Sequence, residues 1–169
     1  ARAPAENTEG WGVCNAGRPL FPRFLPLTFL RRIVFMTERS ALTPADAAAP
    51  TLPFSVGVRV GNTVQVSGQA PTDPQTGEFV FVGDVKAQTV RVLQNVEAVL
   101  TAGGATFDDV IMLRVYLTTR DHFSAMNEAY AEYLTGRCAS GVLPSRTTVM
   151  VGLPHPDMLV EIDALAVVG

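Results

Sequence analysis

Two charged side chains stand in the last two apolar segments of the chain: Arg146 in "SRTTVMV" and Glu161 in "LVEIDALAV". A guanidinium group binds a carboxylate through two parallel hydrogen bonds, so Arg146 is a candidate receptor for a small anion. Its alternative role is a salt bridge to Glu161 or Asp163 between subunits, and residue type alone favours that alternative. Burial among apolar residues would raise the pKa of Glu161, and a nearby arginine would lower it. Such a carboxyl group either transfers protons near neutral pH or is a hydrogen-bonded carboxylate in a subunit interface. Arg146 and Glu161 together predict a cleft that binds a small molecule.

Other polar side chains offer weaker evidence of chemistry. Ser67, in "VQVSGQAP", stands where a predicted strand ends against a glycine. Its hydroxyl could hold a substrate group or a water, although most serines in such places satisfy backbone groups. His122 and His155 fit no Ser-His-Asp arrangement and are expected at the surface. Cys14 and Cys138 lack the spacing of a zinc site or of a disulfide framework, so we expect no metal and a reducing compartment.

The elements that position these residues follow from hydrophobic periodicity and turn residues. In chain order we expect a hairpin of residues 55–60 and 63–70, a helix at 85–102 capped by Asp84, a strand at 109–119, a helix at 121–136 capped by Asp121, and two final strands around Arg146 and Glu161, with a short strand at 79–81 as an optional addition. This order predicts an α+β fold in which two helices pack on one face of a mixed β-sheet.

The last predicted strand has two different faces. Alternate residues from Val160 to Ala166 are apolar and suit packing beneath the helices. The residues between them include Glu161 and Asp163 beside leucines. A sheet face of this mixed character usually meets another subunit, so we expect an oligomer.

Length and composition indicate one globular domain. The chain has 169 residues, of which 47% are hydrophobic and 17% charged. The net charge of −3 is unevenly distributed, because residues 1–35 hold five arginines against two acidic residues and the remainder holds eight basic against fourteen acidic residues. An acidic body without a basic stripe argues against nucleic acid as a partner. Since no run of about 18 apolar residues occurs, we expect no membrane span and a cytoplasmic protein.

Residues 1–47 are predicted to be an N-terminal extension, flexible or not native, ahead of a domain at 48–169. The Arg-rich part of this arm also resembles an organellar presequence. It lacks an amphipathic helical period, however, so we favour Met36 as the true start. The composition of residues 37–53 is typical of a flexible lead-in.

Four segments carry a resemblance to known proteins: "GNTVQVSGQAPTDPQTGE", "AQTVRVLQNVEAVLTAGGATFDDVIMLRVYLT", "FSAMNEAYAEYL" and, above all, "PSRTTVMVGLP" followed by "LVEIDALAV". They resemble the Rid/YjgF family of reactive-intermediate (enamine/imine) deaminases over about residues 53–168. The resemblance implies a fold like that of bacillus-type chorismate mutase and a homotrimer with clefts between subunits. It also implies hydrolysis of 2-imino or 2-enamino acids to 2-oxo acids and ammonia, with no cofactor.

The resemblance also implies roles for individual residues. Arg146 would bind the substrate carboxylate, and Glu161 would handle water and proton transfer. Ser67 would lie near the bound substrate, and Asn127 would line the cleft. Thr148 occupies a position where many members have a cysteine, and substitution there is frequent.

The sequence departs from the family at Phe54, in "LPFSVG", where the family usually has a tyrosine. Phenylalanine keeps the ring and loses a hydrogen bond worth about 0.5–1.5 kcal/mol. This departure leaves open a non-catalytic, ligand-binding or regulatory trimer. An endoribonuclease, an activity often attached to the family's name, is disfavoured by the acidic body.

Overall fold

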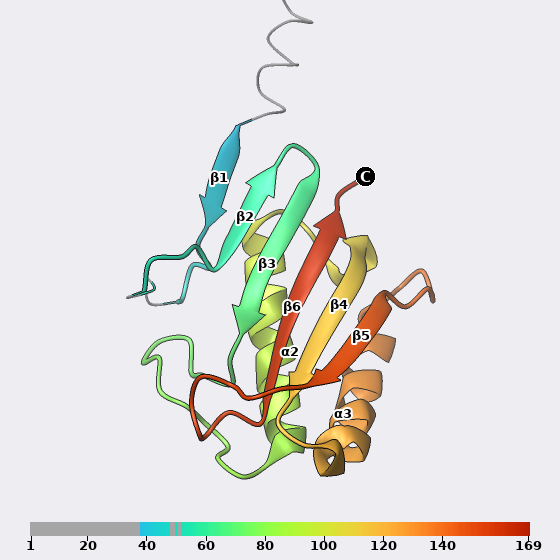
Figure 1. Cartoon of the computed structure of the whole chain (residues 1–169). Coiled ribbons are helices and arrows are strands. Elements are labelled where there is room, and N and C mark those ends of the chain that lie inside the picture. Colours follow the sequence, from blue (N-terminus) through green and yellow to red (C-terminus); the bar gives the residue numbers. More distant parts are fainter. Residues whose placement is uncertain (1–37, 48–49, 51) are drawn as a thin grey trace, which may run out of the picture.

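The computed structural model describes residues 38–47, 50 and 52–169, which form a six-stranded sheet with two helices on one face (Figure 1). The strand order is β1-β2-β3-β6-β4-β5, and only the β4–β5 pair is parallel. The strands are β1 Arg39–Leu42, β2 Gly57–Val60, β3 Thr63–Gln69, β4 Val110–Leu117, β5 Ser145–Met150 and β6 Val160–Val167. The predicted α+β class with a mixed sheet is therefore confirmed. The predicted homotrimer is an assembly, and it stays a prediction.

Two α-helices cover the sheet, and two short 3-10 helices flank β4. They are α2 Val85–Ala102, α3 Phe123–Thr135, η1 Phe107–Asp109 and η2 Arg120–His122. Helix α2 begins at the predicted cap, where the Asp84 carboxylate accepts a hydrogen bond of 3.0 Å from the Ala87 amide. It ends before Gly104, which has a φ of +69° that a side chain would make unfavourable.

The hydrophobic core lies between the sheet and the two helices. The alternate residues of β6 predicted to face the helices are fully buried, as are the residues of β4 paired with them, for example Ile162 with Val115 and Ala164 with Leu113. Helix α2 contributes Leu93 and Leu100, and α3 contributes Leu134, all without exposed surface. Burial of about 25 cal/mol per Å² of apolar surface makes this layer the main source of stability.

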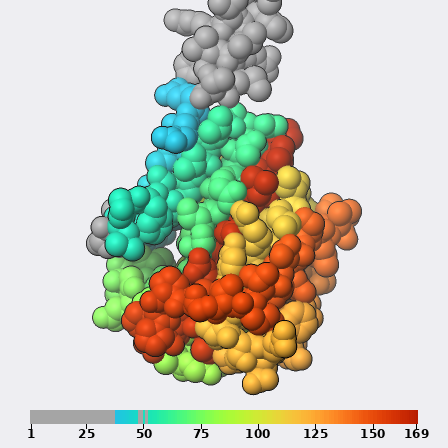
Figure 2. Space-filling model, viewed as in Figure 1, coloured from blue at the N-terminus to red at the C-terminus, as the bar shows by residue number. Residues whose placement is uncertain are grey.

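We call the sheet face away from the helices the open face, and Figures 1 and 2 view the molecule from that side. It carries the residues of β4 and β6 that alternate with the core: Met112, Arg114, Tyr116, Glu161, Asp163 and Leu165. The connection from β5 to β6 runs across the lower part of this face (Figure 2). In the described part of the chain, the helices are too short or too polar to cross a membrane.

The structure corrects three local predictions. Within the expected lead-in, residues 39–42 form strand β1, which pairs with β2, so the sheet begins ahead of residue 48. Asp121 does not cap α3, because it lies inside η2, where the Thr119 hydroxyl accepts a hydrogen bond from its amide. Phe79 forms only an isolated bridge with Thr72 in place of a strand. The Arg-rich arm, Met36 and Cys14 lie outside the described residues.

Candidate functional site

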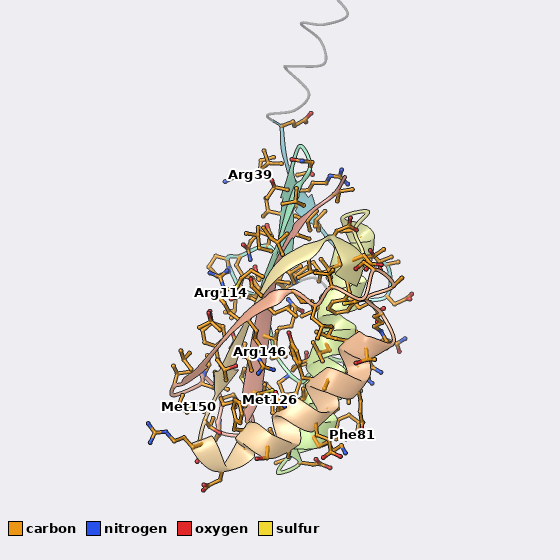
Figure 3. The ribbon with its side chains drawn as sticks, turned by 90° about the vertical axis from the view of Figure 1, so that its right-hand side faces the viewer. Arg39, Phe81, Arg114, Met126, Arg146 and Met150 are labelled. Carbon is orange, nitrogen blue, oxygen red and sulfur yellow. The ribbon has the colours of Figure 1, made fainter. Side chains whose placement is uncertain are left out.

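Arg146 lies on the helix side of the sheet. Its strand is parallel to β4 with Arg146 opposite Leu113, a fully buried core residue, so both side chains point towards the helices. The guanidinium carbon lies 4.6 Å from the centre of the Tyr130 ring and 6.0 Å from that of Phe123, both on α3. Figure 3 shows Arg146 between the sheet and α3, and Arg114 on the other side of the sheet. The aromatic faces hold the cation in place without neutralising it.

Polar groups without partners surround Arg146. Within residues 38–47, 50 and 52–169, no salt bridge or side-chain hydrogen bond involves the Arg146 guanidinium. The hydroxyls of Thr148 and Tyr130 are also buried without a hydrogen-bond partner, and burial raises the pKa of Tyr130 to about 12. Asn127 is half-buried and lies on the same face of α3 as Phe123 and Tyr130. The predicted residues Arg146, Thr148 and Asn127 thus belong to one cluster, which can bind an anion.

Glu161 lies on the open face, half-buried, opposite Tyr116 in the β4–β6 register. Its carboxyl group lies against the backbone of Gly68 in β3, so closely that a Cβ added at Gly68 would be 2.8 Å from the Glu161 Cδ. Burial raises the pKa of Glu161 above its ordinary value, and the negative charge of Asp163 raises it further. Among the described residues, no side-chain hydrogen bond reaches this carboxylate.

A β-bulge brings Gly68 to Glu161. The β3–β6 register shifts by one residue between Val66 and Gln69, so the backbone of the intervening residues bends. Ser67 lies in this bulge, and its hydroxyl donates to the Ser55 carbonyl at 2.7 Å. That bond is the backbone-satisfying role that most strand-end serines have, and it leaves the Ser67 oxygen able to accept one more hydrogen bond.

Phe54 lines a groove of about 1080 Å³ that reaches from Gly68 to the exposed side of α2. The side chain is 49% exposed, so its ring is available to a ligand or to another chain. The groove also contains Arg91 and Asn95 but neither Arg146 nor Glu161.

Arg146 and Glu161 do not meet within one chain. Strand β4 lies between β5 and β6, and the two side chains point to opposite faces of the sheet. Asp163, the other acid offered as a partner for Arg146, is bound on the open face by the Arg114 Nε at 2.7 Å and by the Tyr116 hydroxyl at 2.9 Å. Among the described residues, each chain therefore presents an unpaired guanidinium on one side of the sheet and an unpaired carboxyl group on the other.

Sequence reasoning did not single out Gln88, nor Arg114 and Tyr116, which both bind Asp163. Gln88 is fully buried in α2, and its amide donates to the Asp157 carbonyl at 2.7 Å and accepts from the Leu159 amide at 2.9 Å. It thereby fixes the chain just before Glu161. A glutamine inside an otherwise apolar helix stripe was the available signal, because a buried amide needs partners.

No metal site is apparent among the described residues, where no three side chains of His, Cys, Asp or Glu are grouped for an ion. Cys138 is a buried free thiol, and burial raises its pKa.

Comparisons with known proteins give consistent results. The family model for endoribonuclease L-PSP matches residues 44–168. A RutC family protein of Pyrococcus abyssi is 42% identical over 120 residues, which cover 71% of this chain and 90% of that protein. The crystal structure of E. coli TdcF with bound serine is 34% identical, with a TM-score of 0.70, and the match covers 77% of this chain and 99% of that one. YyfA of Yersinia pestis, from the conserved Rid protein family, is 33% identical with a TM-score of 0.70, covering 78% of this chain and all of that one.

Proposed function

The chain belongs to the Rid/YjgF family, which also carries the description endoribonuclease L-PSP, and we propose that it hydrolyses reactive 2-imino and 2-enamino acids to 2-oxo acids and ammonia. The observation that carries this proposal is the unpaired Arg146 guanidinium, held against Tyr130 beside buried hydroxyls that lack partners. A small compound with a carboxylate would satisfy these groups. In the relative TdcF the bound molecule is serine, which carries such a carboxylate.

The proposed site combines Arg146 of one protomer with Glu161 of the next. Two groups on opposite faces of one sheet reach the same ligand only if a second chain supplies one of them. A ring of protomers satisfies this condition for every chain, and the family resemblance indicates three of them. The mixed polar and apolar open face, together with the exposed side chains of Ile111 and Val149, supports such an assembly.

In this mechanism Arg146 orients the substrate through its carboxylate, which places the C=N carbon beside a water. The Glu161 carboxylate removes a proton from that water as its oxygen bonds to the carbon, and the C=N electrons move to the nitrogen. Glu161 then returns the proton to the nitrogen. The C–N bond then breaks, and the nitrogen takes the electron pair and the hydroxyl proton, so that ammonia leaves as the C=O bond forms. The raised pKa of Glu161 suits a group that must accept and donate a proton in turn.

One observation favours a second candidate, a trimer that binds carboxylate ligands without turnover. Phe54 has no hydroxyl, so it cannot hold the attacking water as the family tyrosine would. This candidate predicts ligand binding that depends on Arg146 but no product. The acidic charge of residues 36–169 weighs against RNA as a substrate, because RNA-binding surfaces are basic.

The test adds the purified protein to an amino-acid oxidase or a threonine dehydratase that generates imino acids, and measures the release of ammonia and 2-oxo acid. We expect acceleration over buffer that falls about 100-fold or more in the Arg146→Ala variant. Arg39→Ala, which removes an exposed arginine from the edge strand β1, is the matched control. A folded protein that gives no acceleration, or an equal loss in both variants, contradicts the proposal.

A further inference from the structure

We infer that Asp163, fixed by Arg114 and Tyr116, is a positioning residue that places a negative charge beside Glu161 and so governs how Glu161 exchanges protons. The inference rests on the proposed function, in which Glu161 exchanges protons with water and substrate.

Side chains alternate between the two faces of the sheet along β6. Glu161 and Asp163 are two residues apart in β6, so both side chains point to the open face. The β4–β6 register places Tyr116 opposite Glu161 and Arg114 opposite Asp163. Two carboxyl groups therefore lie side by side with a cation and a phenol across from them.

The two carboxyl groups have different surroundings. Asp163 is 8% exposed and accepts one hydrogen bond on each oxygen, from the Arg114 Nε at 2.7 Å and from the Tyr116 hydroxyl at 2.9 Å. Glu161 has no side-chain hydrogen bond among the described residues and lies against the Gly68 backbone. Two neighbouring acids in such different environments are suited to different roles in proton transfer.

Within one chain, few charged groups face Glu161. In the proposed assembly, Arg146 of the next protomer also lies at the cleft, and it is the same in all the variants compared below. From β3 it meets Gly68, and from β5 the open face receives Thr147 and Val149, none of which carries a charge. The β5–β6 connection across the lower part of this face carries His155 and Asp157, whose side chains lie 3.8 Å apart and face each other. The charged or titratable neighbours are Asp163 on β6 and Arg114 and Tyr116 on β4. The Tyr116 hydroxyl and the Arg114 Nε both bind Asp163, and the negative charge of Asp163 raises the pKa of Glu161.

Removing either partner of the Arg114–Asp163 salt bridge tests the inference. Asp163→Asn and Arg114→Gln both remove the ion pair, so a purely structural role would give them similar effects. Their charge effects are opposite: the first leaves a cation near Glu161, and the second leaves an anion without its counter-ion. We therefore expect Asp163→Asn to lower the titration midpoint of Glu161 by about one pH unit and Arg114→Gln to raise it.

The measurement is a carbon-13 NMR titration of the full chain labelled at glutamate Cδ, with the Glu161 signal assigned by its absence in Glu161→Gln. Lys86→Gln, which removes the exposed Lys86–Glu128 pair on the helices, is the matched control and should leave the midpoint unchanged. Shifts in the same direction in Asp163→Asn and Arg114→Gln, or no shift in either, overturn the inference. If Asp163→Asn does not fold, a lowered or unchanged midpoint in Arg114→Gln overturns it equally.

The titration needs no turnover, so it separates this inference from the proposed function. If the wild-type protein deaminates imino acids, the acid limb of its pH–rate profile should move with the NMR midpoint in each variant. A protein without activity whose midpoints still move in opposite directions refutes the function and keeps the inference.

Discussion

Arg146 and Glu161 lie on opposite faces of one sheet, with strand β4 between their own strands. The Arg146 side chain contacts helix α3, whereas Glu161 faces away from both helices. A single chain therefore presents the two halves of the proposed machinery in two directions. Whether they act together is a question about the assembly, and it can be answered by mixing chains.

Mixed assemblies should recover activity that neither variant has alone. If Arg146→Ala and Glu161→Gln protomers assemble at random into trimers, about three quarters of the trimers are mixed, and each of these has one cleft with both groups intact. Co-refolding equal amounts should therefore restore about a quarter of the wild-type rate in the coupled imine assay. Each variant refolded alone is the control, and activity no greater than the sum of the two contradicts a site shared between protomers.

Gly68→Ala should disturb Glu161 more than it disturbs the fold. The new Cβ would meet the Glu161 carboxyl group, and that flexible side chain can move aside while the sheet stays intact. We expect kcat/KM to fall about tenfold and Tm to change by no more than about 3 °C. Gly152→Ala is the control, because a Cβ there has no atom within 4 Å. Unchanged kinetics in Gly68→Ala would show that the position of Glu161 does not matter.

Glu161→Gln should stabilise the folded protein at neutral pH. Burial raises the pKa of Glu161 on folding, so the ionised carboxylate weakens the fold above the raised pKa. That penalty fades as the pH falls through the raised pKa, and it is absent below the ordinary value of 4.5. Because the side chain is half exposed, we expect a gain in Tm of only about 1–3 °C at pH 7. Thermal unfolding from pH 4 to pH 8, at fixed protein concentration, checks it. A gain in Tm that grows towards acid pH would contradict the prediction.

Phe54→Tyr should raise turnover. The added hydroxyl supplies one hydrogen bond, worth about 0.5–1.5 kcal/mol, which corresponds to a gain of about 2- to 12-fold in kcat. The side chain is 49% exposed, so the fold should accept the extra oxygen without strain. Steady-state kinetics on the same imino acid give the answer, with Phe81→Tyr, which adds a phenol at another exposed ring, as the control. Equal kcat in the wild type and Phe54→Tyr would mean that the ring alone matters at this position.

Local patterns predicted much of the fold. The Gly61-Asn62 hairpin, the Asp84 cap and the apolar alternation of β6 are all interactions between residues close in sequence, and the structure contains each of them. Strand β1 was missed because only one of its four side chains, that of Leu42, is buried. An edge strand of that length has no alternation to detect.

The site was harder to predict, because its contacts depend on strand pairing. Alternation predicted which side of the strand of Glu161 meets the helices, but for the strand of Arg146 it gave two sides without saying which of them does. The order β6-β4-β5 decides it, and that order joins residues far apart in the chain. The same long-range register places Arg114 beside Asp163, which residue types alone assigned as a partner for Arg146.

The hydrogen bonds of the Gln88 amide restrict the length of the segment that leads into β6. One amide from α2 holds the backbone at Asp157 and Leu159, and nearby the ring of Phe79 stacks on His155 with centroids 4.1 Å apart. The segment that leads into β6 is therefore clamped from a helix and from a separate turn. An insertion or deletion in this segment would remove the Asp157 and Leu159 partners and leave the amide poorly paired inside the core. We therefore expect the length of the segment and the residue type at position 88 to change together among homologues. Homologues with a longer segment are expected to have another residue in place of the glutamine.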